Sequence, residues 1–154
     1  MAQFSSRIAY ADFNEMAPQI RTALVDLGRA AVEAGIEKDL LELIKLRASQ
    51  INGCAFCLQY HLNIARGLGV TPEKLDLVAA WRDAEIYSGR ECAALEWTEL
   101  LTRVAQEHIT DEAFAAVRTQ FSEKEVVFLT GAICAINSWN RLSVAFRFAP
   151  PPRE

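Results

Sequence analysis

The sequence predicts an all-α protein, and three features lead to that class. Apolar residues recur at helical spacing along almost all of the 154 residues. No run of alternating β-branched residues is long enough to predict a strand. Residue pairs with capping-box spacing, such as Ser88 with Glu91 and Ser122 with Glu125, mark helix starts. We therefore expect a compact multi-helix fold.

The predicted helices follow from these start and stop signals. The first begins at Pro18, since proline is favoured in a first turn, and ends at Gly35. The next two are separated by Asn52-Gly53, a strong turn signal. We expect the later helices to begin at helix-capping residues and the last to be apolar on every side. The ranges after the first helix are residues 38–51, 54–66, 72–81, 88–107, a helix from 110, and 122–146.

One domain is the expected organisation for residues 1–154, because no repeat or linker divides the chain. Residues 1–15 form a leader segment, which we expect to be irregular, and residues 149–154 form a tail. The net charge is −4, and the sixteen Lys and Arg residues are scattered, so nucleic acid is not an expected partner. No secretion signal or membrane-length apolar run is present, which predicts a cytosolic protein.

The chain has four cysteines, and two of them stand alone. Cys92 and Cys134 lie in apolar surroundings, and free cysteine is among the most buried residue types. We expect both to be small core residues. A close cysteine pair in the cytosol is more often catalytic or metal-binding than structural. The pair Cys54 and Cys57 is therefore the candidate for chemistry.

Cys54, Cys57 and His61 share one face of a helix, within an arc of roughly 60° at 3.6 residues per turn. The cysteines open this helix, where the macrodipole and unpaired backbone N–H groups favour a thiolate. His61 lies one turn beyond Cys57 and is placed to accept a thiol proton. Cys57 is the candidate nucleophile and Cys54 its resolving partner.

Glu42 reaches this group only if the chain folds back at Asn52-Gly53. An antiparallel helical hairpin about that turn brings Glu42 level with His61. A carboxylate there orients the imidazole and raises its basicity, as the third member of a nucleophile–base relay does. Glu42 is also three residues before Lys45, so an ordinary surface ion pair is the alternative.

Zinc binding is a second interpretation of the same residues. Cys54, Cys57, His61 and Glu42 would supply four plausible ligands. Structural zinc sites usually draw a second close pair from elsewhere, and this chain has none, so we expect no metal and no cofactor. His108 is predicted at the end of a helix, where the helix dipole explains a histidine without any function.

The spacing of these residues resembles a known motif. Glu42, eleven residues, Cys54, two residues, Cys57, three residues and His61 resemble the motif of the alkylhydroperoxidase D family, within the carboxymuconolactone decarboxylase superfamily. The segment INSWNRLSVAFR, residues 136–147, also resembles a late helix of that family. The resemblance covers about residues 15–148. The decarboxylases of the superfamily, which lack the cysteine pair, are a poorer match.

The resemblance implies an oligomeric, cofactor-free peroxidase. It implies that Cys57 attacks the peroxide, that Cys54 resolves it as an intramolecular disulfide, and that Glu42 and His61 form the proton relay. In the best-known members a dihydrolipoyl group on a partner protein supplies the electrons, so a dithiol reductant is implied here. Those members have a histidine immediately before the second cysteine, where this chain has Phe56, and that part of their proton network is absent.

The predicted function is reduction of alkyl or hydrogen peroxide by a thiol-dependent peroxidase. A disulfide reductase or redox sensor using the same cysteines, and a zinc-stabilised interaction protein, remain alternatives. We also expect a homo-oligomer, a trimer or hexamer, because the leader and the all-round apolar segment 126–136 present more apolar surface than one short chain covers. The leader residues concerned are Phe4, Ile8, Tyr10 and Phe13.

Overall fold

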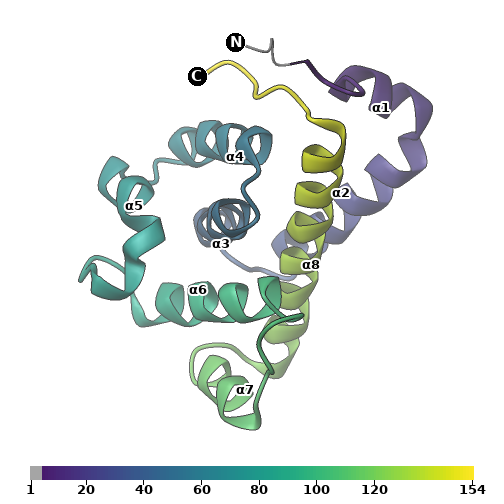
Figure 1. Cartoon of the computed structure of the whole chain (residues 1–154). Coiled ribbons are helices and arrows are strands. Elements are labelled where there is room, and N and C mark those ends of the chain that lie inside the picture. Colours follow the sequence, from purple (N-terminus) through teal and green to yellow (C-terminus); the bar gives the residue numbers. More distant parts are fainter. Residues whose placement is uncertain (1–4) are drawn as a thin grey trace.

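The computed structural model describes residues 5–154, and helices are the only regular elements within that range (Figure 1). This confirms the all-α prediction. The elements are α1 Tyr10–Met16, α2 Pro18–Glu33, α3 Lys38–Ile51, α4 Ala55–Gly67, α5 Pro72–Leu77, the 3-10 helix η1 Val78–Asp83, α6 Gly89–Thr102, α7 Asp111–Arg118 and α8 Glu123–Phe146.

Helix α3 lies at the centre of the fold, with α4, α5, α6 and α8 around it (Figure 1). Its apolar residues are buried on almost every side, among them Leu41, Leu43, Ile44 and Leu46. On its opposite sides, Leu41 and Ile44 join one buried cluster with α6 and α8, while Leu43 and Leu46 join another with α4, α5 and η1. The central helix is therefore a rigid support for any side chain that it presents.

The turn between α3 and α4 forms at Asn52-Gly53, as the sequence predicts. Gly53 has φ +65°, a left-handed conformation that glycine adopts without the penalty of a Cβ atom. Cys54 follows in an extended conformation as the N-cap of α4, and its backbone N–H donates to Ser49 O at 3.0 Å. Helices α3 and α4 consequently form the expected hairpin, with the cysteines at the start of its second helix.

The leader differs from its prediction. It is not irregular, because Tyr10–Met16 forms α1, and Phe4 lies outside the described residues. Phe13 is buried among Trp139, Phe146 and Phe148 of the same chain. The backbone N–H of Arg7 also donates to Phe146 O at 2.9 Å. Aromatic packing on the end of α8 therefore gives the leader a local partner that its sequence did not reveal.

Two other predicted helices have different boundaries. The helix from residue 88 ends at Thr102 and not near 107, so His108 lies in a connecting segment and the helix-end interpretation of it is wrong. Val104, Ala105 and Gln106 are exposed, and without a packing partner the periodic pattern does not extend the helix. The helix predicted for 72–81 is divided into α5 and η1.

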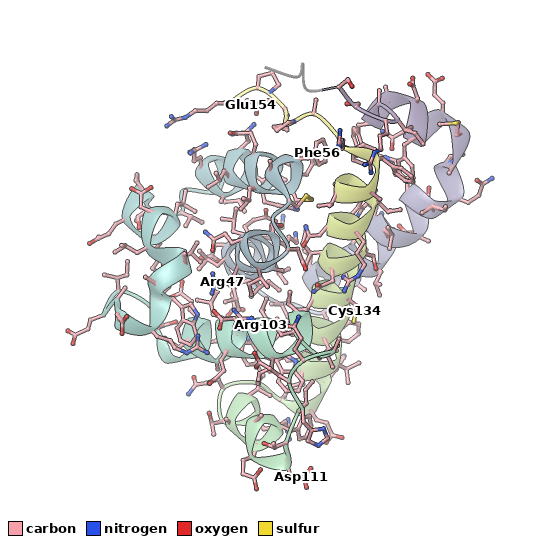
Figure 2. All side chains as sticks on the ribbon, viewed as in Figure 1. Arg47, Phe56, Arg103, Asp111, Cys134 and Glu154 are labelled. Carbon is pink, nitrogen blue, oxygen red and sulfur yellow. A yellow bond between two sulfur atoms is a disulfide. The ribbon has the colours of Figure 1, made fainter. Side chains whose placement is uncertain are left out.

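The two isolated cysteines also differ from expectation. Cys134 is exposed and Cys92 is only partly buried. Cys134 lies on the outer side of α8, which other helices of this chain leave uncovered (Figure 2). Val127 on α8 is 65% exposed, so this apolar helix is not buried on every side as predicted. No helix among residues 5–154 is both long and apolar enough to cross a membrane.

Candidate active site

The cysteine pair lies at the start of α4, where the structure joins Cys54 and Cys57 as a disulfide. Cys54 Sγ accepts a hydrogen bond from the backbone N–H of Cys57 at 3.2 Å, as an N-cap side chain does. Both residues are almost completely buried. Their sulfur atoms thus occupy the positive end of a helix, and this position favours a thiolate in the reduced protein.

His61 lies one turn along α4 and makes the contact that the hairpin predicts. Its Nδ1 atom is 2.7 Å from Oε2 of Glu42 on α3. The other carboxylate oxygen of Glu42 accepts a hydrogen bond from Lys45 Nζ at 2.6 Å. The two interpretations of Glu42 therefore both apply, but the ion pair is buried and not on the surface, since the Glu42 side chain is 5% exposed.

The charge state of Glu42 determines what His61 can do. Burial raises the pKa of Glu42, but the hydrogen bonds and charges of His61 and Lys45 outweigh burial and hold this pKa below its usual value. The ionised carboxylate has no proton to donate, so the hydrogen bond requires the proton on His61 Nδ1. In the neutral imidazole, Nε2 is then the free basic atom.

A cavity of about 520 Å³ opens beside this group between α2, α3, α4 and α8. Cys57 and His61 both line it, whereas Cys54 does not. Most of the lining is apolar, and it includes Phe56, Ile64, Ile136 and Trp139. Its volume is typical of sites for small organic molecules, which lie at roughly 300–1,000 Å³. Of the two sulfur atoms, the one on Cys57 is accessible to a ligand in this cavity.

Polar residues of α8 hold the hairpin turn in place. Asn52 Nδ2 donates to Asn140 Oδ1 at 2.9 Å and to Asn137 Oδ1 at 3.0 Å. Asn140, which is fully buried, donates in turn to Ser49 Oγ on α3 at 3.0 Å. One turn further, Ser143 Oγ lies 3.5 Å from Cys57 Sγ. Helix α8 therefore fixes the position of both cysteines relative to α3.

Phe56 belongs to an aromatic group at the edge of the cavity, between α4 and the end of α8 (Figure 2). Its ring centroid is 4.9 Å from that of Tyr10, 5.4 Å from Phe148 and 6.0 Å from Tyr60. At the position before the second cysteine, where the motif implies a histidine, this chain therefore has Phe56. Its apolar contacts hold Tyr10 of the leader and Phe148 against the site. Burial raises the pKa of Tyr60, as do Tyr10 and Glu42, while Arg21 lowers it by less.

The four predicted residues, Cys54, Cys57, His61 and Glu42, therefore lie together. Among the residues that the structure describes, no group of three or more His, Cys, Asp or Glu is arranged to hold a metal ion. Sequence reasoning missed the contributions of Ser143 and Asn140. Their spacing from Ile136, at seven and four residues, marks one face of α8, and polar residues on such a face would have been the signal.

The comparisons with known proteins agree with this geometry. The model of the carboxymuconolactone decarboxylase family matches residues 18–100, more than half of the chain. The chain is 38% identical over 141 residues to the uncharacterized protein YdfG of Bacillus subtilis, covering 92% of this chain and 94% of that protein. It is 37% identical, with a TM-score of 0.88, to a protein of unknown function from Agrobacterium tumefaciens proposed to be the antioxidant defence protein AhpD, covering 97% and 100% of the two chains.

The fold and site define an all-helical protein with a cysteine pair at a helix start beside a Glu–His pair. The chain belongs to the carboxymuconolactone decarboxylase family and is alkylhydroperoxidase D-like. The fold by itself does not determine the reaction. The debrominase Bmp8 has the same fold, with a TM-score of 0.74 at 20% identity, covering 89% of this chain and 74% of that one.

Proposed function

We propose that this protein is a thiol-dependent peroxidase that reduces alkyl hydroperoxides or hydrogen peroxide through Cys57. The observation that carries the proposal is the common cavity of Cys57 and His61, from which Cys54 is absent. A nucleophile must reach its substrate, and its base must lie beside it. Cys54, one turn away and capping the helix, is placed to attack Cys57 and not the peroxide.

The reaction follows from these positions. His61 Nε2 takes the proton of the Cys57 thiol, and the thiolate attacks the outer oxygen of the hydroperoxide. The O–O bond breaks, the departing alkoxide receives the proton from His61, and Cys57 becomes a sulfenic acid. Cys54 then attacks the Cys57 sulfur, its own proton leaves with the hydroxyl group as water, and the disulfide forms. Glu42 holds His61 and stabilises the transient imidazolium.

The cycle needs a reductant that returns two electrons and two protons to the disulfide. A dithiol performs this by thiol–disulfide exchange, and we propose a dihydrolipoyl group on a partner protein or a similar small dithiol in the cytosol. The family members that use a lipoyl group have a histidine at the position of Phe56, and Phe56 makes apolar contacts instead. The identity of the dithiol is therefore best decided by a panel of reductants.

The test is consumption of tert-butyl hydroperoxide and hydrogen peroxide by the reduced protein, with dithiothreitol or dihydrolipoamide as electron donor. Wild type should turn over, and Cys57→Ser should consume no peroxide. Reduced Cys54→Ser, freed of dithiol before the peroxide is added, should consume about one equivalent and stop at the sulfenic acid. Peroxide turnover by Cys57→Ser at the wild-type rate would contradict the proposal. If the wild-type protein reduced disulfide substrates but did not turn over peroxide, it would instead be a disulfide reductase.

A further inference from the structure

The charged residues around the active-site cavity are all cations. Arg21 and Arg29 of α2 and Lys38 and Lys45 of α3 line it, and no Asp or Glu does. The protein as a whole carries a net charge of −4, so a concave surface lined by four cations and no acid has a charge opposite in sign to that of the whole protein. Such a surface concentrates anions by focusing the field within the cleft.

Two of these cations already have partners. Arg29 forms ion pairs with Asp26 at 2.7 Å and Glu33 at 3.1 Å, and Lys45 pairs with Glu42 at 2.6 Å. Arg21 and Lys38 make no ion pair with any carboxylate among residues 5–154. Their charges are therefore available to a ligand, one from α2 and one from α3.

The rest of the lining is apolar and adjoins the reactive sulfur. Phe56, Ile64, Ile136 and Trp139 line the same cavity as Cys57, and they would contact the apolar body of a ligand there. Lys38 is seven residues before Lys45 on one helix, roughly 10 Å along the axis. The cations therefore lie at separate positions along the cavity wall.

We propose that the preferred substrate is an amphiphilic organic hydroperoxide with a carboxylate that the charges of Arg21 and Lys38 attract into the cavity. This inference rests on the proposed peroxidase activity and specifies its substrate class. The apolar body excludes water along the cavity walls and directs the O–O bond to Cys57. The carboxylate adds affinity and orientation, and hydrogen peroxide and small neutral hydroperoxides lack both contributions.

The first experiment compares a hydroperoxy fatty acid with its methyl ester, which differ in charge and hardly in shape. The ratio of their kcat/KM values should favour the acid about tenfold in wild type. This ratio should fall about threefold or more in Arg21→Gln and in Lys38→Gln, and close to one in the double variant. Lys124→Gln, which removes a cation outside the cavity, is the matched control and should keep the wild-type ratio and activity.

The second experiment needs no turnover. The disulfide form should bind decanoate but not methyl decanoate in calorimetry, and Arg21→Gln with Lys38→Gln should abolish that binding. Equal kcat/KM for acid and ester, with no decanoate binding, would overturn the substrate class while leaving the peroxidase proposal intact. The same result is expected if a second copy of the chain fills the cavity. Decanoate binding without turnover of any hydroperoxide would support the anion site and overturn the peroxidase proposal.

Discussion

The imidazole of His61 is the residue on which the proposed chemistry depends most directly. Its Nδ1 atom is engaged by Glu42, and its ring lines the cavity with Cys57. Replacing it with alanine removes both the base and the charge that stabilises a neighbouring thiolate. These two effects act on the thiol before any peroxide is present, so they can be measured separately from turnover.

We therefore expect His61→Ala to slow the alkylation of Cys57 by iodoacetamide at neutral pH by about tenfold, in the reduced protein. Mass spectrometry of the labelled peptide measures the rate. His108→Ala is the control, because His108 is exposed in a connecting segment far along the chain. Unchanged alkylation in His61→Ala would mean that the histidine has only a structural role.

Glu42 acts on the reaction through His61 and is a positioning residue. The Glu42→Gln variant removes its negative charge, so we expect turnover to fall about 10- to 100-fold. The pH–rate profile should also shift, a change that a purely structural role would not produce. Glu91→Gln is a matched control, because Glu91 likewise accepts a 2.6 Å hydrogen bond from a lysine, Lys74, but outside the site. Wild-type turnover in Glu42→Gln would reduce Glu42 to a partner of Lys45.

Helix α8 carries the polar residues that hold the α3–α4 hairpin, and Asn140 is at their centre. Removing its side chain leaves Ser49 without this donor in a buried region and leaves Asn52 with Asn137 alone. We expect Asn140→Ala to lower the free energy of unfolding by about 1–3 kcal/mol in urea titrations. The disulfide should also form more slowly, because the turn before Cys54 is less well fixed.

Ser138→Ala on the same helix is the control for that prediction. The Ser138 hydroxyl bonds only to the backbone of its own helix, at Cys134 O. Its loss should change the stability by less than about 0.5 kcal/mol. If Asn140→Ala were as stable as this control, the contacts between α8 and the turn would have no energetic role, and the position of the cysteines would have to depend on apolar packing alone.

A group of ion pairs around the buried residue Glu99 joins α3, η1 and α6. Glu99 accepts hydrogen bonds from Arg47 and Arg82 at 2.6 Å and from Trp81 at 3.0 Å, and Arg103 lies 3.3 Å away. Figure 2 labels Arg47 and Arg103, which lie on α3 and just after α6. Burial raises the pKa of Glu99, but its donors outweigh burial and lower this pKa to about 2.

The stability that Glu99 contributes should therefore depend on pH. Because its folded pKa is lowered from 4.5, the contribution is present above pH 4.5 and lost as the pH falls toward about 2. We expect Glu99→Gln to lower the free energy of unfolding by roughly 3 kcal/mol at pH 7, and the difference from wild type to shrink in acid. Glu96→Gln, at an exposed residue of the same helix, should show a small effect at every pH. A difference independent of pH would contradict this assignment.

The outer surfaces of α2 and α8 bear on the assembly of the molecule. Ile20 and Leu27 on α2 are 48% and 41% exposed, and Leu27 lies beside Gly131 on α8, one turn from exposed Val127. Because Phe13 packs on its own chain, the apolar residues of the leader are no longer an argument for an oligomer. These exposed residues provide a different and contiguous apolar surface.

We therefore still expect a homo-oligomer, a trimer or hexamer, with α2 in its interface. Light scattering should give a multiple of the 17.2 kDa chain mass at micromolar concentration. Val127→Glu should reduce that mass, whereas Leu77→Glu on α5, across the molecule from α2 (Figure 1), should leave it unchanged. A wild-type mass near that of one chain would refute the expectation.

The sequence alone determined the helical class, the hairpin at Asn52-Gly53 and the group of Cys54, Cys57, His61 and Glu42. These are consequences of local chemistry: helical periodicity, a glycine turn, and side chains placed on facing helices by the number of residues between them. The bounds of α3, Lys38–Ile51, were predicted to the residue for the same reason, since charged residues and a turn enclose an apolar run.

Tertiary structure decided everything that depends on what a segment packs against. The leader became α1 because the aromatic end of α8 receives Phe13, and α6 ended at Thr102 because residues 104–106 have nothing to cover. Cys134 is exposed although its sequence neighbours are apolar, because the helices around α8 leave this side of it uncovered. The cavity, its cations and the contact of Ser143 with Cys57 join residues up to 129 positions apart, and no local pattern encodes such distances.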